Sequence, residues 1–344
     1  MKHLFFLFLF FFFFFNPSLS LRTVTSNPCD PAPSRDPPHL RSDQITVLIN
    51  GYSESRLPLL QSLAAAYSAS PLVAAVLVLW GNPSTPPQTL AQLSHNLTAF
   101  SFGSAPISVV PHPSRSLNAR FLPRPSAIAT VAVLICDDDV EIDANSVAFA
   151  FRVWEKNPNR LIGFFARSHD IDLARREWMY TVHPDRYSIV LTKFMILNRR
   201  YLYLYSCGGG AAMVRARSVV DRARNCEDIL MNFVVAEETG AGPVQVGAKW
   251  ARDWGDARNE DDGDGDGDGD GDGDGRRRLS GVVAQVGLSS RRAEHRKRRG
   301  VCIREFHRVL GKMPLRYSYG KVVNSVREQG LCRKGGKLVF CDQN

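Results

Sequence analysis

The sequence lacks any recognisable nucleic-acid-binding module, although its 344 residues carry a formal net charge of +9. Most of the excess positive charge falls in one late stretch, Arg291 to Arg304, which reads RRAEHRKRRGVCIR. A local basic cluster of this kind suits a phosphate-bearing ligand or an acidic membrane face. Because nothing in the chain resembles an element that reads bases, we do not expect nucleic acid as a partner.

Two further signals are missing. The histidines have no metal-ligand spacing to one another, so we interpret His169, His183, His295 and His307 as structural or solvent-facing. The run Gly208 to Gly210 lacks the spacing of a dinucleotide-binding or P-loop motif, and it predicts a turn or a substrate-binding loop instead.

The N-terminal stretch from Leu4 to Phe15 is an unbroken apolar run, but it is shorter than the about 20 residues that a bilayer span needs. Lys2 precedes this run, and Ser18 and Ser20 follow it, which predicts a signal peptide or signal anchor over residues 1–20. We therefore expect entry into the secretory pathway. The expected destination is the Golgi lumen or the Golgi membrane, as a single-pass type II protein associated with the membrane through its N-terminus, with a cleaved signal peptide as the alternative.

Seven cysteines are present, an odd number, so at least one is unpaired or pairs between chains. Cys136 lies in an apolar run and is interpreted as a buried free thiol. Cys332 and Cys341 flank a short segment and could close a small loop. Cys226 and Cys302 flank a long segment, and a bridge between them would hold the basic stretch against the acidic run NCED.

Short apolar runs alternate with helical patterns from Gln44 onward, after a Pro- and Ser-rich stem over residues 21–43. Leu59, Leu60, Leu63 and Ala66 are expected on one face of the first helix. Strands are expected at 45–49, 73–80, 107–110, 131–135, 161–166 and 187–197, and a second helix at 145–154. This alternation predicts an α/β fold with a mostly parallel sheet covered by helices on both faces, over residues 44–320, followed by an extension over residues 321–344.

Gly and Asp alternate almost without interruption from Asp261 to Asp274. This composition cannot be buried in a core, so we predict a disordered surface insertion over residues 261–275. A calcium loop would need varied ligand spacing and a closing Glu, which this run does not have.

Polar residues follow several of the predicted strands. Asn50 and Asn82 each come just after an apolar run, and Asp137, Asp138 and Asp139 follow the run AVLIC. Ligands of open parallel sheets bind at the carboxyl ends of the strands. Three adjacent carboxylates repel one another unless a cation or hydrogen-bond donors compensate, and hard oxygen ligands suit Mn²⁺ or Mg²⁺ bound together with a diphosphate. The alternative is that acidic residues here cap a helix, as Asp143 could.

The segments ICDDDVEID, FAFRVW, YSIVLTKF and NCEDILMNF together resemble the exostosin-like glycosyltransferases of family 64, over about residues 44–319 without the Gly-Asp insertion. The resemblance implies the nucleotide-diphospho-sugar transferase fold called GT-A. It is greatest with the plant branch, in its short single-domain C subgroup. That branch includes enzymes that add mannose or an amino sugar to glycosylinositol phosphorylceramides, whereas the animal relatives act in heparan sulfate synthesis.

The resemblance implies a role for each residue of the acidic turn. Asp137 and Asp139 form the DxD motif, in which Asp139 is the first choice as a direct metal ligand. Asp137 and Asp138 then face the ribose and the sugar. Asn82 matches a residue near the base, and Asn118 and Arg120 lie in a segment that lines the nucleotide site.

The resemblance also assigns the catalytic segment. Asp228 occupies the position of the family's carboxylate, Cys226 and Cys302 match a family disulfide, and Arg299 matches an arginine that contacts the diphosphate. Asp228 would stabilise the positive charge on the anomeric carbon or attack that carbon. The alternative for Asp228 is a cap at the start of a helix, with Glu227 as the fallback carboxylate.

One residue departs from the family pattern, because Glu54 stands where the family often carries an arginine in its first loop. Arg56 is a substitute for it.

The function we predict is metal-dependent, retaining transfer of a hexosyl or N-acetylhexosaminyl group from a UDP- or GDP-sugar to a glycan or glycosphingolipid. A non-catalytic protein that binds sugar nucleotides or glycans is the alternative. A third hypothesis, binding of an anionic membrane or nucleic acid through Arg291 to Arg304, predicts salt-sensitive binding that survives loss of Asp139.

Overall fold

The computed structural model describes residues 28–29, 40–100, 105–255, 292–325, 330–334 and 337–341. The predicted signal segment, the Gly-Asp insertion and most of the predicted stem lie outside these residues. Among the described residues, no helix is both long and apolar enough to cross a membrane.

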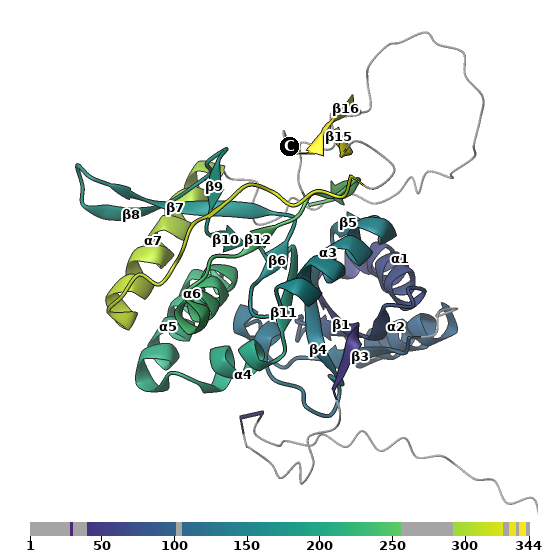
Figure 1. Ribbon diagram of the computed structural model, residues 1–344. Coiled ribbons are helices and arrows are strands. Elements are labelled where there is room, and N and C mark those ends of the chain that lie inside the picture. Colours follow the sequence, from purple (N-terminus) through teal and green to yellow (C-terminus); the bar gives the residue numbers. More distant parts are fainter. Residues whose placement is uncertain are drawn as a thin grey trace, which may run out of the picture.

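A seven-stranded sheet forms the centre of the described part of the chain (Figure 1). The strand order is β12 (Val244–Gln245), β6 (Ile162–Gly163), β11 (Phe194–Asn198), β4 (Thr130–Asp137), β1 (Arg41–Gly51), β2 (Val73–Trp80) and β3 (Ile107–Pro111). Strands β4, β1, β2 and β3 are parallel to one another, and β12 is parallel to β6, while β11 runs antiparallel between β6 and β4.

Helices cover both faces of this sheet (Figure 1). On one face lie α1 (Leu57–Ser68), α2 (Pro87–Phe100) and α3 (Ala144–Lys156). On the other lie α4 (Arg200–Cys207), α5 (Gly210–Ala223), α6 (Glu227–Thr239) and α7 (Arg292–Leu310), with the short 3₁₀ helix η2 (Leu117–Phe121). A second 3₁₀ helix, η1 (Glu54–Arg56), precedes α1.

Four small sheets complete the described structure. They consist of β10 (Ile189–Val190), β7 (Ala166–Asp172) and β8 (Glu177–Thr181); β13 (Ala251–Asp253) and β5 (Val140–Ile142); β14 (Ser318–Tyr319) and β9 (Arg186–Tyr187); and β15 (Leu331–Lys334) and β16 (Lys337–Phe340).

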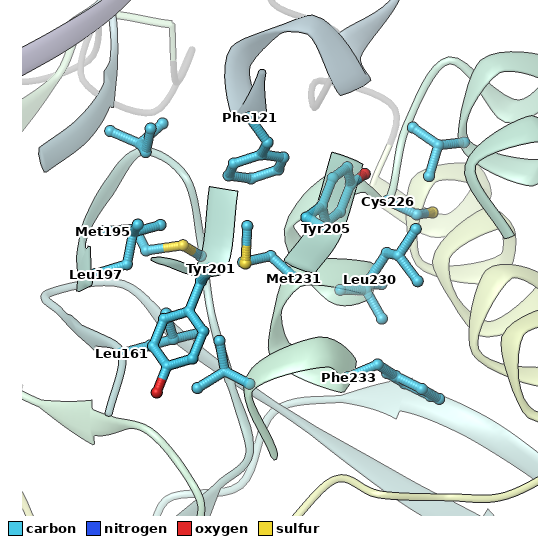
Figure 2. Packing of buried hydrophobic residues seen from close by; sticks show 14 of the residues in the cluster. Phe121, Leu161, Met195, Leu197, Tyr201, Tyr205, Cys226, Leu230, Met231 and Phe233 are labelled. Carbon is cyan, nitrogen blue, oxygen red and sulfur yellow. The ribbon is translucent and has the colours of Figure 1, made fainter. Parts of the chain in front are cut away.

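The central strands are buried on both faces because their side chains alternate between two apolar layers. In β1, Val47 and Ile49 face α1 to α3, whereas Leu48 faces α4 to α7. Figure 2 shows the second layer, where Phe121 and Tyr205 pack with ring centroids 4.6 Å apart. The predicted fold class, an α/β fold with a mostly parallel central sheet and flanking helices, is confirmed.

Several local predictions need correction. In α1 the buried face contains Leu60, Leu63, Ala64 and Tyr67, while Ala66 is exposed, because the apolar stripe is shifted toward the C-terminus. The two long apolar runs at 161–166 and 187–197 are not continuous strands. The first run passes from β6 in the central sheet to β7 in a small one. The second passes from β9 and β10 in small sheets to β11 in the central sheet, so each run divides where it changes sheet.

Two disulfides tie distant segments of the described chain together, Cys29 to Cys207 and Cys226 to Cys302, and a third, Cys332 to Cys341, closes a short hairpin. The predictions for the Cys332–Cys341 loop and for a buried free thiol at Cys136 are confirmed. Disulfides of this kind persist in oxidising compartments, so they indicate the secretory pathway.

Candidate active site

Three parallel strands end together at one edge of the sheet. Asn50 in β1 pairs in register with Asp137 in β4 and with Leu79 in β2. The carbonyl oxygen of Asn50 accepts a hydrogen bond of 3.2 Å from the backbone N–H of Asp138. Asn82 follows β2, and its side-chain oxygen accepts from the backbone N–H of Ser84 at 3.0 Å, which holds the turn after the strand. This edge therefore brings the predicted donor-binding residues Asn50, Asn82 and Asp137 to Asp139 close together.

An arginine from η1 contacts the acidic turn. Arg56 donates from Nη1 to Oδ1 of Asp138 at 3.1 Å and to Oδ2 of Asp139 at 2.8 Å. The backbone N–H of Tyr52 donates to the other oxygen of Asp138 at 3.3 Å. Asp138 is only 4% exposed, so these contacts compensate part of the cost of burying its charge. Arg56 thus points to the acidic turn, and Glu54 is exposed.

A second arginine links the acidic turn to the start of α6. Arg120 is 5% exposed, and its Nη1 lies 3.0 Å from Oδ1 of Asp137 and 3.3 Å from Oε1 of Glu227. Thr192 donates to the same Glu227 oxygen at 3.2 Å. The buried Nε of Arg120 has no hydrogen-bond partner within the described part of the chain. One guanidinium therefore connects the predicted metal-binding turn with the segment that carries Asp228.

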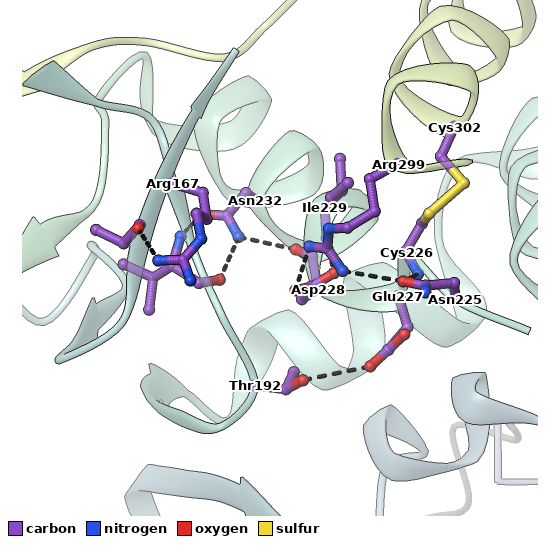
Figure 3. A network of polar contacts seen from close by, with 12 residues as sticks. Arg167, Thr192, Asn225, Cys226, Glu227, Asp228, Ile229, Asn232, Arg299 and Cys302 are labelled. Carbon is purple, nitrogen blue, oxygen red and sulfur yellow. Dashed lines mark hydrogen bonds and ion pairs between the residues drawn. A yellow bond between two sulfur atoms is a disulfide. The ribbon is translucent and has the colours of Figure 1, made fainter. Parts of the chain in front are cut away.

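Asp228 and Arg299 form a buried ion pair, with Nη2 of Arg299 2.6 Å from Oδ2 of Asp228 (Figure 3). Arg299 also donates to Oδ1 of Asn225 at 2.9 Å, and its guanidinium lies 4.5 Å from the centre of the Tyr180 ring. The Cys226–Cys302 disulfide joins the N-terminus of α6 to α7, close to this pair (Figure 3). The Asp228 carboxylate raises the pKa of the Arg299 guanidinium above its usual value, so Arg299 is charged at any working pH.

Asp228 lies in the first turn of α6, where the alternative interpretation placed a helix cap. Its Oδ1 accepts from the backbone N–H of Ile229 at 2.8 Å, while its Oδ2 contacts Arg299. Asp143 does cap a helix, because it accepts from the backbone N–H of Ser146 at 2.9 Å at the start of α3. The carboxylates of the acidic turn are therefore not needed as caps for α3.

The carboxyl groups of the acidic turn are costly to ionise, chiefly because they are buried and secondly because of the charges around them. Burial raises the pKa of Asp137 to about 7, although Arg120 opposes the shift, and it raises the pKa of Asp138 to about 6, with Asp139 adding to the effect. The pKa of Asp139 is also raised, chiefly by burial. Carboxylates thus outnumber the guanidinium groups that neutralise them, which is the electrostatic setting that a divalent cation stabilises.

The donor set fits Mn²⁺ or Mg²⁺ as a partial site. Among the residues that the structure describes, no three Asp, Glu, His or Cys side chains are grouped so that they could hold a metal ion by themselves. Mg²⁺-type sites commonly use one or two carboxylates and complete the shell with water and substrate phosphates. Asp139 and Asp137 are the residues that would supply those carboxylates here.

The sequence missed Lys193, Asp253 and Gly255, which also lie at the acidic turn. Lys193 forms an ion pair with Asp253, and β13 brings Asp253 beside β5 directly after the turn. A Cβ atom on Gly255 would lie 2.3 Å from Oδ2 of Asp139, so a larger residue here would displace that carboxylate. Asp253 and Gly255 are more than a hundred positions from Asp139 in the chain, and no local motif marks them.

Asn118 has a different environment. Its amide nitrogen donates to Oδ1 of Asp221 at 2.9 Å and to the carbonyl of Arg217 at 3.0 Å, and its oxygen accepts from the hydroxyl of Tyr205 at 2.5 Å. These contacts hold η2 against α4 and α5. Contact between Asn118 and a nucleotide stays a prediction.

The amino-acid sequence is similar to those of several known proteins. The chain is 62% identical over 325 residues to glycosyltransferase family protein 64 C3 of Arabidopsis thaliana, covering 94% of this chain and 93% of that protein. It is 37% identical over 193 residues to exostosin-1 of Bos taurus and of Mus musculus, which covers 56% of this chain but only 24% of those proteins. Their activities as whole proteins therefore do not transfer directly.

A solved structure of GalNAc-T7 with UDP, GalNAc and Mn²⁺ aligns with a TM-score of 0.39 and 13% identity, over 56% of this chain and 40% of that one, a likeness that supports no statement about activity. The model of the glycosyl transferase family 64 domain matches residues 45–327, most of the chain. On this match and the relationship to the Arabidopsis protein, the chain belongs to glycosyltransferase family 64.

Proposed function

We propose that this glycosyltransferase transfers a sugar, with retention of configuration, from a UDP- or GDP-sugar to a glycan or glycosphingolipid in a Mn²⁺-dependent reaction. The observation that carries the proposal is the Asp137–Arg120–Glu227 connection. It joins the acidic turn Asp137 to Asp139 to the segment that carries the buried Asp228–Arg299 pair, which supports a single site that includes both.

Each charged group has a role that follows from its position. Asp139 and Asp137 would hold the cation, which when bound neutralises charge on the leaving diphosphate. Arg299 donates from Nη1 to Asn225 and from Nη2 to Asp228, and its Nε, which has no hydrogen-bond partner among the described residues, is the donor left for a phosphate oxygen. Asp228, held by Arg299 and by the N–H of Ile229, supplies negative charge for the anomeric carbon as positive charge develops there.

Arg56 adds a step to donor binding. In the structure it contacts both Asp138 and Asp139, where the cation would bind. With a cation bound at Asp139, the Arg56 guanidinium would lose that partner and could turn to the negatively charged diphosphate. Donor and cation are therefore expected to bind better together than separately.

Transfer or hydrolysis of UDP- and GDP-sugars by the purified chain with Mn²⁺ tests this function. Asp139→Ala and Asp228→Ala should each lower turnover by about 10²- to 10³-fold, the usual effect of removing one preorganised charge. Glu238→Ala is the matched control, since Glu238 pairs with Arg200 on the surface. Activity that is equal in all three variants would refute the assignment.

A non-catalytic donor-binding protein is the second candidate. It is favoured by the arginines that contact the key carboxylates, Arg56 at Asp139 and Arg299 at Asp228. Calorimetric donor binding that depends on Asp139, without turnover of any nucleotide sugar, would support this candidate.

We also propose the Golgi as the site of action. Imaging of tagged full-length protein beside Golgi markers would test this location.

A further inference from the structure

Helices α5 and α7 border a groove that is lined by none of the residues assigned above to the donor, the cation or catalysis. Its volume is about 830 Å³, and small-molecule sites commonly measure roughly 300–1,000 Å³. The α7 side is made by residues three or four positions apart, which lie on one face of that helix: Arg298, Val301, Cys302 and Glu305. We call this feature the α5–α7 groove.

The α5–α7 groove carries an excess of positive charge. Among the described residues, the charged side chains that line it are three arginines and one glutamate, with Arg222 and Arg224 at the end of α5 and Arg298 and Glu305 on α7. Both oxygens of Glu305 accept hydrogen bonds from Arg308, at 2.6 Å from Nη2 and 3.4 Å from Nε. The acid of the lining is therefore paired with an arginine that does not line the groove, and the three lining arginines are left in excess.

The positive charge of α5 acts across the groove on α7. The pKa of the Glu305 carboxyl is lowered, first by its hydrogen bond with Arg308, and Arg222 contributes to the same shift from the other helix. A negative charge between α5 and α7 is thus stabilised by guanidinium groups from both helices.

Arg224 occupies an unusual backbone position. It caps the C-terminus of α5 with a φ of 47°, in the left-handed region that glycine or asparagine adopts at lower cost. Its side chain is exposed and forms no hydrogen bond or ion pair within the part of the chain that the structure describes. Neither feature stabilises the fold, as is expected of a side chain that serves a ligand.

Apolar atoms complete the lining. Val301 is 41% exposed, and Cys302 is bonded to Cys226 at the start of α6 (Figure 3). All the lining cations are arginines, whose planar guanidinium donates parallel hydrogen bonds to two oxygens of a phosphate or sulfate group. A ligand that joins such a group to an apolar ring or chain matches both parts of the groove.

We propose that the α5–α7 groove binds a small soluble ligand in which a phosphate or sulfate group is attached to an apolar body. Arg222, Arg224 and Arg298 hold the oxyanion, while Val301 and the neighbouring disulfide contact the apolar body. This binding does not require donor turnover, so the inference stands apart from the proposed function.

Calorimetry with phenyl phosphate tests the proposal, on the full chain freed of metal ions by a chelating resin. Phenyl phosphate should bind about tenfold more tightly than inorganic phosphate, because its ring covers apolar atoms of the lining. Arg222→Gln combined with Arg224→Gln should weaken the binding of phenyl phosphate by about threefold to tenfold for each arginine.

The matched control removes two positive charges from the same helices. Arg215 on α5 and Lys297 on α7 are exposed and do not line the groove. Arg215→Gln combined with Lys297→Gln should therefore keep the parent affinity to within about twofold in physiological salt. An equal loss of affinity in the two double variants would show that binding follows net charge alone, which overturns the proposal. Absence of binding to the parent chain, or equal affinity for the two phosphates, also overturns it.

Two other occupants are outcomes of the same test. The run from Asp261 to Asp274 supplies carboxylates within this chain, so its aspartates are replaced together by serine. Affinity for phenyl phosphate should be unchanged, and binding that appears only after the replacement would assign the groove to that run. Vesicles of phosphatidylcholine with phosphatidic acid present phosphate on a lipid surface. Sedimentation with these vesicles that depends on Arg222 and Arg224, without binding of phenyl phosphate, would assign the groove to a membrane and overturn the proposal.

Discussion

Removing the Arg120 side chain should reveal how strongly the acidic turn depends on it. Arg120 is 5% exposed and contacts Asp137 at 3.0 Å and Glu227 at 3.3 Å, so Arg120→Met leaves the partly buried Asp137 and the buried Glu227 without their shared cation. Removing one partner of a buried ion pair costs about 3–5 kcal/mol. At about 2–4 °C per kcal/mol for a domain of this size, Tm should fall by about 6–20 °C.

The assay is thermal unfolding in chelator and then in excess Mn²⁺. Mn²⁺ should stabilise Arg120→Met more than the parent chain, because a divalent cation replaces the missing positive charge next to Asp137. Arg124→Met is the matched control, since Arg124 lies in the same segment but donates only to the carbonyls of Leu122 and Ala119. Its Mn²⁺ response should equal that of the parent.

Two results would refute this reasoning. A Tm for Arg120→Met within about 2 °C of the parent would show that the carboxylates do not need the guanidinium. An identical response to Mn²⁺ in Arg120→Met and Arg124→Met would show that the cation does not bind near Asp137.

Three other predictions concern separate parts of the molecule. Burial lowers the pKa of His169 from 6.5 to about 4. The unfolded chain therefore takes up a proton first as the pH falls, and roughly 3 kcal/mol of stability should be lost between about pH 6.5 and 4. The free energy of unfolding in urea, measured at about pH 6.5 and at about pH 4, should depend less on pH in His169→Asn than in the parent chain. An equal dependence on pH in both chains would show that His169 does not cause the loss. Gly255→Ala places a Cβ 2.3 Å from Oδ2 of Asp139, so the affinity for Mn²⁺, measured by electron paramagnetic resonance, should fall by about 10- to 100-fold while the free energy of unfolding changes little. An affinity for Mn²⁺ equal to that of the parent chain would show that Asp139 is not a ligand. Replacing Cys29 and Cys207 together by Ser should lower the free energy of unfolding by about 2–5 kcal/mol while donor hydrolysis is retained, and a loss of hydrolysis at full folding would assign that disulfide to the site.

The parts of the fold that were predictable from the sequence are those with local patterns. The runs 45–49, 73–80 and 131–135 are uninterrupted and apolar, and they form the parallel strands β1, β2 and β4. The run 187–197 was predicted as one strand, but it divides where Thr192 and Lys193 contact Glu227 and Asp253. Polar residues do interrupt this run, but they do not by themselves show that the pieces on either side belong to different sheets.

The same distinction holds for the candidate site. The acidic turn could be found because three carboxylates follow a buried strand, and Arg299 because the family resemblance pointed to it. The direction of Arg56 and the approach of Gly255 to Asp139 depend on contacts between residues far apart in the chain. The partner of Cys29 was equally out of reach, because spacing alone does not fix disulfide pairing.

The Cys226–Cys302 disulfide makes assembly of the site a matter of redox chemistry. Arg299 lies one turn of α7 before Cys302, and Asp228 lies two residues after Cys226, so a single covalent bond keeps the two charged partners together. In a chain held among reduced thiols, only noncovalent packing would bring the cation to the carboxylate. Oxidation after entry into the secretory pathway would then complete the charge arrangement, and a newly made chain would stay incompletely organised until that point.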